Sequence, residues 1–238
     1  MPGGSLQRRK ATPKRKRGWL VNTILVIFGL IFTFYLVCAC LIFSLRAFNP
    51  PTTAVQIQRE VGALLAKKNY NKRQLYVPLS RISPDLQYAV IAAEDGRFYV
   101  HHGFDWLELQ KVVHTDLAKK SLGRGGSTIT QQLAKNVFLG TERSIVKKGI
   151  EFTLVPMFEW FLGKNRILEL YLNEIEWGPG VFGAEAATEF WYHTPATQIT
   201  RDQAARLAAI IPNPLKRAPA RENEYSEEIQ ARMKTMGW

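Results

Sequence analysis

Glu94 interrupts a helical stripe that is otherwise apolar. Leu86, Val90 and Glu94 follow one another at intervals of four, and Ala89 and Ala93 lie beside them on the same face. A carboxylate on such a face is expected to point toward the core or a cleft rather than toward water. Burial would disfavour its charged form and raise its pKa, which suits a general base or acid near neutral pH.

The helix that carries Glu94 has recognisable ends. Ser83 can cap the free amides at its start, Pro84 suits the first helical position, and Gly96 allows the chain to leave the helix. Arg97 follows Glu94 by three residues, so an ordinary surface ion pair between the two is the alternative interpretation.

A second polar group begins at two glycines, where residues 125–132 read GGSTITQQ. The free amides and positive dipole end of a helix start favour an anion, and Ser127, Gln131 and Lys135 would share one helical face. The segment lacks the Gly-Lys-Ser/Thr of a P-loop, so nucleotide binding is not indicated. The alternative is that Ser127 merely caps the helix.

A third group combines cations with an acid. Arg143, Lys147 and Glu151 again fall at intervals of four, with Lys148 adjacent. Such spacing usually means a solvated ion ladder worth roughly 0.2–0.5 kcal/mol per pair. The residues that follow Glu151 are unusually apolar, however, which favours a second carboxylate that lies in a cleft and is held by cations.

His101 and His102 give only a weak indication of a metal site. Adjacent side chains on a helix or strand diverge, and no helical histidine motif with a carboxylate accompanies them. A hydrogen bond that positions the loop after Glu94 is the preferred interpretation.

The N-terminal segment predicts a membrane anchor. Residues 1–18 carry seven Lys and Arg and no acid, whereas residues 19–45 carry no charge over 27 positions, more than the roughly 20 that cross a bilayer. We expect a basic cytoplasmic tail, a transmembrane helix and an exported domain. A cleaved signal peptide is the alternative, but its apolar region would span only ~7–15 residues.

Charge and cysteine content restrict the chemistry of the exported part. The net charge is +12, and without the seven basic residues of the tail it is +5. Nucleic acid is not expected across a membrane, so anionic lipid or an anionic membrane-bound substrate is the better partner, and a generic solubilising surface is the alternative. Cys38 and Cys40 lie inside the span, which leaves the exported part without a disulfide or thiolate metal site.

Hydrophobic periodicity predicts a mainly α domain of many short helices. Residues 46–74 are expected to form a linker and a juxtamembrane helix from about 54 to 68, and the domain itself covers residues 75–238. Residues 75–79 resemble a strand, which Pro78 restricts to an edge or connector. Thr200 and Gln203 form a capping box, and the glycine-rich loop at 177–180 is expected to form part of a cleft wall.

Taken together, these residues resemble the motif set of the peptidoglycan glycosyltransferases, carbohydrate-active family 51, and especially its monofunctional membrane-anchored members. The first motif, E-D-x-x-F-x-x-H-x-G, is met by residues 94–103. The second, G-x-S-T-x-T-Q-Q, is met by residues 125–132, with Lys135 and Asn136 following. The third, R-K-x-x-E, ends at Glu151 and has Lys147 in place of Arg, which keeps the charge but loses a planar fork of donors. A fourth and a fifth motif follow at 164–173 and 206–214.

The resemblance implies a lysozyme-like fold with a smaller, membrane-facing lobe around residues 103–123. It implies a bacterial cytoplasmic (inner) membrane location with the catalytic domain on the periplasmic or extracellular side, and no transpeptidase domain, since the chain stops at Trp238. The substrate would be lipid II, polymerised into β-1,4-linked glycan strands with inversion and release of undecaprenyl pyrophosphate. Membrane lipid and cell-wall synthesis or division proteins are further expected partners.

The resemblance also assigns roles to particular residues. Glu94 and Glu151 would be catalytic, and a divalent cation, Mg²⁺ or Mn²⁺, could bind the pyrophosphate near Glu151. The expected substrate-binding residues are Ser127, Thr128, Gln131, Gln132, Lys135, Asn136, Arg143 and Lys148.

Two other functions would use the same residues less well. A peptidoglycan-cleaving lysozyme-like or lytic enzyme needs an acid for a sugar leaving group and has no use for cations that hold a pyrophosphate. A non-catalytic division scaffold would have no reason to keep two acids and several cations of one site together.

Overall fold

The computed structural model describes residues 15–111, 126–142 and 144–238. The chain divides into two compact units, Met1–Leu41 and Ile42–Trp238. Most of helix α1 (Arg15–Ser44) belongs to the first unit, and its part Gly18–Ser44 is long and apolar enough to cross a membrane. The helix expected at residues 19–45 is therefore present, with the length and composition of a membrane span.

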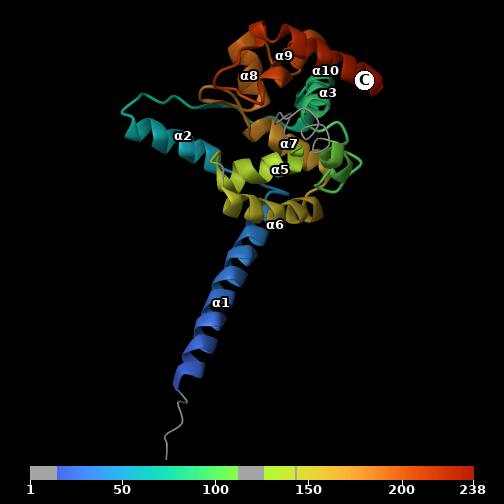
Figure 1. The fold of residues 1–238 in the computed structure, drawn as a ribbon. Helices are drawn as coiled ribbons and strands as arrows, with labels where there is room; N and C mark the ends of the chain where they lie inside the picture. The colour runs from blue at the N-terminus through green and yellow to red at the C-terminus, as the bar shows by residue number, and fades with distance from the viewer. Residues whose placement is uncertain (1–14, 112–125, 143) are drawn as a thin grey trace, which may run out of the picture. The chain divides into compact units, whose positions relative to one another are not determined.

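The second unit is built mainly from helices, as the sequence predicts. These are α2 (Ala54–Leu65), α3 (Pro84–Glu94), α5 (Ile129–Ala134), α6 (Ile145–Phe161), α7 (Lys164–Glu174), α8 (Ala184–Tyr192), α9 (Arg201–Ile210) and α10 (Asn223–Thr235), with the short turns η1 (Leu79–Arg81), η2 (Lys135–Leu139) and η3 (Pro219–Arg221). Helix α3 packs on α9 and α10, whereas α5 packs on α6 and α7. Figure 1 shows α7 between these two groups of helices.

Two of the predicted helix starts are confirmed. The Ser83 hydroxyl accepts the amide of Asp85 at 3.2 Å, and Pro84 is the first residue of α3. Thr200 and Gln203 form the expected capping box of α9.

Helix α2 ends earlier than predicted and buries less. It stops at Leu65 rather than near residue 68. Val55 is buried, but Ile57 and Val61 are exposed, and Leu64 and Leu65 are exposed by 75% and 79%. The apolar stripe of this helix is therefore mainly a surface feature.

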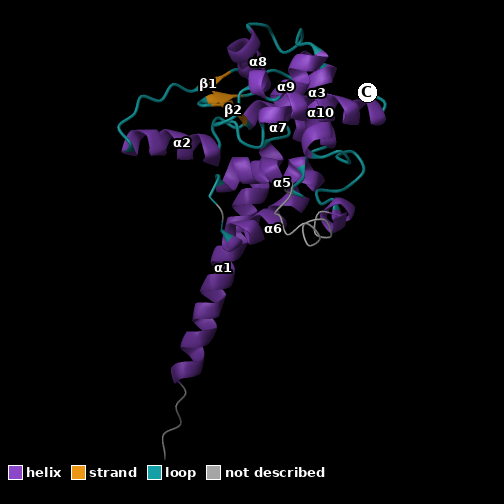
Figure 2. Ribbon diagram, turned by 45° about the horizontal axis from the view of Figure 1, so that its top comes forward, coloured by secondary structure: helices purple, strands orange, loops and turns teal. Residues whose placement is uncertain are grey.

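Three short strands form a small sheet in the part of the chain that the structure describes (Figure 2). Strand β3 (Val181–Phe182) lies between β1 (Arg73–Gln74), to which it is parallel, and β2 (Glu176–Gly178), to which it is antiparallel. The glycine-rich loop predicted at residues 177–180 is shorter than expected, because Trp177 and Gly178 belong to β2 and only Pro179 and Gly180 form the turn to β3. Gly180 has φ +74°, and a Cβ atom on it would lie 2.9 Å from the Asn71 carbonyl oxygen, so this turn requires glycine.

Candidate active site

A cleft of about 1040 Å³ lies in the second unit and contains Glu94. Its walls come from the end of α3 and the loop after it, the start of α5, η2, α2 and α10, and its volume is that of a large ligand site. Eight of the predicted site residues line it: Glu94, Ser127, Thr128, Gln131, Gln132, Lys135, Asn136 and Glu151. The fold therefore brings the three polar groups of the sequence together in one cavity.

Glu94 is the last residue of α3 and is half-buried. Its Oε2 accepts a hydrogen bond of 2.6 Å from Gln132 Nε2, and Gln132 Oε1 accepts one of 2.8 Å from the Tyr171 hydroxyl. Burial, reinforced by the charge of Glu94, raises the pKa of Tyr171 well above its usual value, so this hydroxyl stays protonated and donates. The tyrosine therefore turns the nitrogen of the Gln132 amide toward Glu94. Arg97, the alternative partner considered for Glu94, pairs with Asp105 at 3.2 Å.

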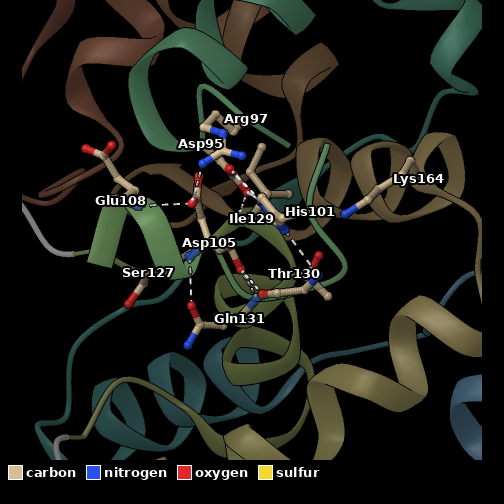
Figure 3. A network of polar contacts seen from close by, with 12 residues as sticks. Asp95, Arg97, His101, Asp105, Glu108, Ser127, Ile129, Thr130, Gln131 and Lys164 are labelled. Carbon is tan, nitrogen blue, oxygen red and sulfur yellow. Dashed lines mark hydrogen bonds and ion pairs between the residues drawn. The ribbon is translucent and has the colours of Figure 1, made fainter. Parts of the chain in front are cut away.

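The loop after α3 is bound to the start of α5, and Figure 3 shows Asp95, His101 and Ile129 in this network. Asp95 Oδ2 accepts the Ile129 amide at 3.0 Å, and the Thr128 hydroxyl donates to the Gly103 carbonyl at 2.7 Å. His101 Nδ1 accepts the Gly103 amide at 3.1 Å, so its other ring nitrogen carries the proton and donates to Asp95 at 2.8 Å. The prediction that His101 positions this loop is confirmed.

Three backbone amides at the start of α5, those of Thr128, Ile129 and Gln131, are engaged within the protein, so this helix start offers less to an anion than the sequence predicts. Thr128, not Ser127, is the N-cap: its hydroxyl accepts the Gln131 amide at 3.2 Å, while Gln131 Oε1 accepts the Thr128 amide at 3.0 Å. The Ile129 amide is bound to Asp95, and α5 is only 6 residues long. Negative charge on a substrate must therefore be met mainly by side chains.

Glu151 is buried on α6 and lines the same cleft. Its Oε1 accepts the Lys148 ammonium group at 2.5 Å and the Gln131 side-chain amide at 3.2 Å. The predicted ladder at intervals of four is wrong for Lys147, which pairs with Glu142 at 3.0 Å. The acid is instead paired with the residue three positions before it. The expected substrate-binding Arg143 lies outside the described residues.

A second pocket of about 430 Å³ adjoins the cleft and shares Lys135 and Glu151 with it. Its charged lining residues are Lys135, Lys147, Lys148, Glu142 and Glu151. The balance of these charges is positive, and each of the two acids has a lysine partner. This end of the cavity therefore suits an anionic group such as a pyrophosphate.

The sequence did not predict a polar network around Glu159. Glu159 Oε1 accepts the Thr130 hydroxyl at 2.6 Å and the Lys164 ammonium group at 2.8 Å, and Lys164 lies 4.5 Å from the centre of the Phe98 ring. These contacts join α5, α6, the start of α7 and the loop after α3. Figure 3 shows Thr130 and Lys164 at this network. No helical spacing relates these residues, so a single sequence carries no signal for the network.

The sequence also did not indicate two further parts of the cleft wall. Helix α10 contributes Tyr225 and Arg232, and its C-cap residue Met236 also lines the cleft, although this segment contains no motif that marks a site. At another part of the wall, Arg59 of α2 pairs with Glu176 of β2 at 2.8 Å. The cleft wall therefore also presents a phenol, two guanidinium groups and a thioether.

One group of side chains among the described residues has the composition of a metal site. Asp95, His101 and Asp105 each offer a ligand atom within 4.8 Å of the others. Hydrogen bonds already engage both nitrogens of the imidazole, and Asp105 Oδ1 accepts from Arg97 and from the Glu108 amide at 3.0 Å. Internal hydrogen bonding therefore accounts for this cluster.

The sequence matches one known protein family and several named relatives. Residues 61–236 match the family described as Transglycosylase. A protein of Herminiimonas arsenicoxydans named biosynthetic peptidoglycan transglycosylase is 46% identical over 168 residues, 70% of this chain and 72% of its own. Relatives of the same name from Laribacter hongkongensis and Chromohalobacter salexigens are 40% identical over 196 residues (82% and 86% of the two chains) and 37% identical over 225 residues (93% and 96%). This chain therefore belongs to the transglycosylase family.

Proposed function

We propose that this chain polymerises lipid II into the β-1,4-linked glycan strands of peptidoglycan and releases undecaprenyl pyrophosphate. The observation that carries the proposal is that Glu94 lines a cleft that adjoins the positively charged pocket of Lys135 and Lys148, with Lys135 and Glu151 lining both. A carboxylate that removes a proton and ammonium groups that receive a pyrophosphate are the parts that this reaction needs. The names of the relatives support the same activity.

In this reaction Glu94 takes the proton of the 4-hydroxyl of the acceptor sugar while that oxygen attacks the anomeric carbon of the donor. The bond from the anomeric carbon to the pyrophosphate oxygen breaks, and its electron pair leaves with the pyrophosphate. Lys135 and Lys148 stabilise the departing charge, and Glu151 orients Lys148. One displacement inverts the anomeric carbon. Gln132, expected to bind substrate, is assigned instead to Glu94, to which it donates.

The described residues around Glu151 do not form a cage for a divalent ion by themselves. Glu151 Oε1 accepts an ammonium group and an amide, whereas Mg²⁺ and Ca²⁺ sites use several oxygen ligands. An ion at the pyrophosphate would take most of its ligands from the substrate and water. Mg²⁺ or Mn²⁺ therefore stays a prediction, and the steps above are assigned to side chains.

We also propose that α1 is a single-pass anchor in a bacterial cytoplasmic membrane. The basic residues before the span favour a cytoplasmic N-terminus, which would place the cleft on the outer side of the membrane. A lipid-linked donor and a growing strand are substrates that such an anchored domain can reach.

Glu94→Gln tests the proposed base. We expect the variant to fold normally and to polymerise purified lipid II at least about 100-fold more slowly, since a positioned base contributes ~10²–10⁴ in rate. Glu108→Gln is the matched control, because it neutralises another carboxylate of the cleft wall that has no assigned role. Retained polymerisation by Glu94→Gln would rule out the base role. Release of soluble fragments from sacculi, without chain growth, would favour a peptidoglycan-cleaving enzyme.

A further inference from the structure

The segment that leaves the membrane helix is held in the second unit. Residues 42–49 belong to that unit, and Ile42 and Leu45 are buried in it. The amides of residues 45–48 bond back to the carbonyls of residues 42–44 as the helix ends. The carbonyls of Leu45 and Phe48 lie beyond these acceptors and need donors from elsewhere.

Arg166, in the first turn of α7, supplies these donors. Its Nε donates to the Leu45 carbonyl at 2.7 Å, and its Nη2 donates to the Phe48 carbonyl and to Asn49 Oδ1 at 2.9 Å each. Residues 42–53 contain no acid, so within this segment the cation meets backbone carbonyls just after the C-terminal end of α1, where the helix carries partial negative charge. A guanidinium group suits this task because it presents several donors in a fixed plane and stays charged.

The other side of the same guanidinium group is bound to the catalytic domain. Nη1 donates to the Tyr76 hydroxyl at 2.9 Å and to Glu169, whose second oxygen accepts the Leu79 amide at 2.7 Å. All five N–H groups of Arg166 therefore have acceptors, three of them in residues 45–49. Tyr76 and Glu169 therefore hold the Arg166 side chain independently of its contacts with residues 45–49.

Helix α7 also carries Tyr171, which orients Gln132 toward Glu94. Arg166 and Tyr171 are five residues apart, or ~7.5 Å along the helix axis. Helix α7 therefore carries both Arg166, which contacts residues 45–49, and Tyr171, which orients the hydrogen-bond donor of the proposed base Glu94.

We propose that Arg166 is a positioning residue that fixes the exit of the membrane helix, residues 45–49, on α7 so that the cleft works efficiently on a substrate embedded in a bilayer. The proposal rests on the proposed function, because only a membrane-borne donor makes this attachment useful for catalysis. Loss of the attachment should leave the chemistry of the cleft intact and reduce its use of substrate in a membrane.

The test uses the full-length protein and four variants. Arg166→Ala removes all the hydrogen bonds of the guanidinium group to residues 45–49. Arg166→Lys keeps the positive charge but loses the planar set of donors. Asn49→Ala removes one exposed acceptor of Arg166. Arg201→Ala is the matched control, since Arg201 also donates to a main-chain oxygen, that of Trp238, far along the chain from residues 45–49. Two readouts are measured: hydrogen exchange of the amides of residues 45–48, and lipid II polymerisation in phosphatidylglycerol and phosphatidylethanolamine vesicles and in detergent.

For Arg166→Ala we expect the protection of these amides to fall by about tenfold, because hydrogen bonds from a charged group are lost. Polymerisation in vesicles should fall by a similar factor while the rate in detergent stays within about twofold of wild type, with Arg166→Lys and Asn49→Ala intermediate. Unchanged protection in both Arg166→Ala and Asn49→Ala, or an equal loss of rate in vesicles and detergent, would overturn the proposal. If wild type polymerises in neither medium, the proposed function fails, and the exchange data alone then decide whether Arg166 holds the exit segment.

Discussion

Replacing Tyr171 with phenylalanine removes one hydroxyl group from the line of hydrogen bonds that ends at Glu94. In the wild-type protein this hydroxyl donates to Gln132 Oε1 at 2.8 Å, and Gln132 Nε2 donates to Glu94 Oε2 at 2.6 Å. Without the hydroxyl, the Gln132 amide can turn over and present its oxygen to the carboxylate. The ionised form of Glu94 would then lose a donor and face an acceptor, so protonation would become easier.

The size of the effect follows from the hydrogen bond between Gln132 and the Glu94 carboxylate, which is lost when the amide turns over. A hydrogen bond to a charged group contributes about 1.5–3 kcal/mol, and about 1.4 kcal/mol corresponds to one pH unit. Because Gln132 keeps its original orientation part of the time, we expect the acid limb of the pH–rate profile to move upward by about one unit. A general base must be ionised, so the rate falls up to about tenfold on the acid side and stays near wild type on the plateau.

The measurement is the initial rate of polymerisation of labelled lipid II across the pH range. Tyr192→Phe is the matched control, because the Tyr192 hydroxyl is buried without a hydrogen-bond partner among the described residues. Its removal should leave the profile unchanged. Gln132→Leu should reproduce the displaced acid limb, since it removes the same donor from Glu94. A uniform loss of rate at every pH in Tyr171→Phe, with an unmoved acid limb, would show that the tyrosine acts only through packing.

Two further predictions concern stability, measured by urea unfolding of the purified protein. Gly103→Ala should lower the free energy of unfolding by about 2–4 kcal/mol, because φ is +90° and the new Cβ would lie 2.5 Å from Val155 Cγ1; Gly149→Ala, with open space around it, is the control and should not destabilise. Burial raises the pKa of Glu174 from 4.5 to about 7, so the folded state holds its proton more tightly and stability should fall by on the order of 3 kcal/mol as pH rises from about 4.5 to about 7. Glu174→Gln should remove most of this decline, and an unchanged decline would contradict the assignment.

Local patterns in the sequence predicted the helices and several of their ends because these features depend on neighbouring residues. Ser83 and Thr200 cap the helices that their spacing indicated. The alternative in which Ser127 caps α5 was wrong, although the sequence contains the correct cap: Thr128 is followed three residues later by Gln131, and the two form a capping box.

The remaining features depend on contacts between segments that are distant in the sequence. Strands β2 and β3 have 3 and 2 residues, too few for an alternating pattern to appear. The Glu94 stripe predicted a carboxylate at a cleft, but its partners Gln132 and Tyr171 lie 38 and 77 residues further along the chain. A single sequence cannot show that a motif glutamine serves the acid rather than the substrate.

Helix α7 explains why the site and its supports depend on one another. It is largely buried yet rich in polar residues, and buried polar groups are costly unless they are bonded. Its polar side chains bond to partners in different segments: Lys164 to α6, Arg166 to the residues just after α1, Tyr171 to α5, and Asn173 to the Val77 backbone. Substitutions at Arg166 and Tyr171 should therefore affect the rate through the relative placement of these segments, in addition to any loss of stability from buried groups left unbonded.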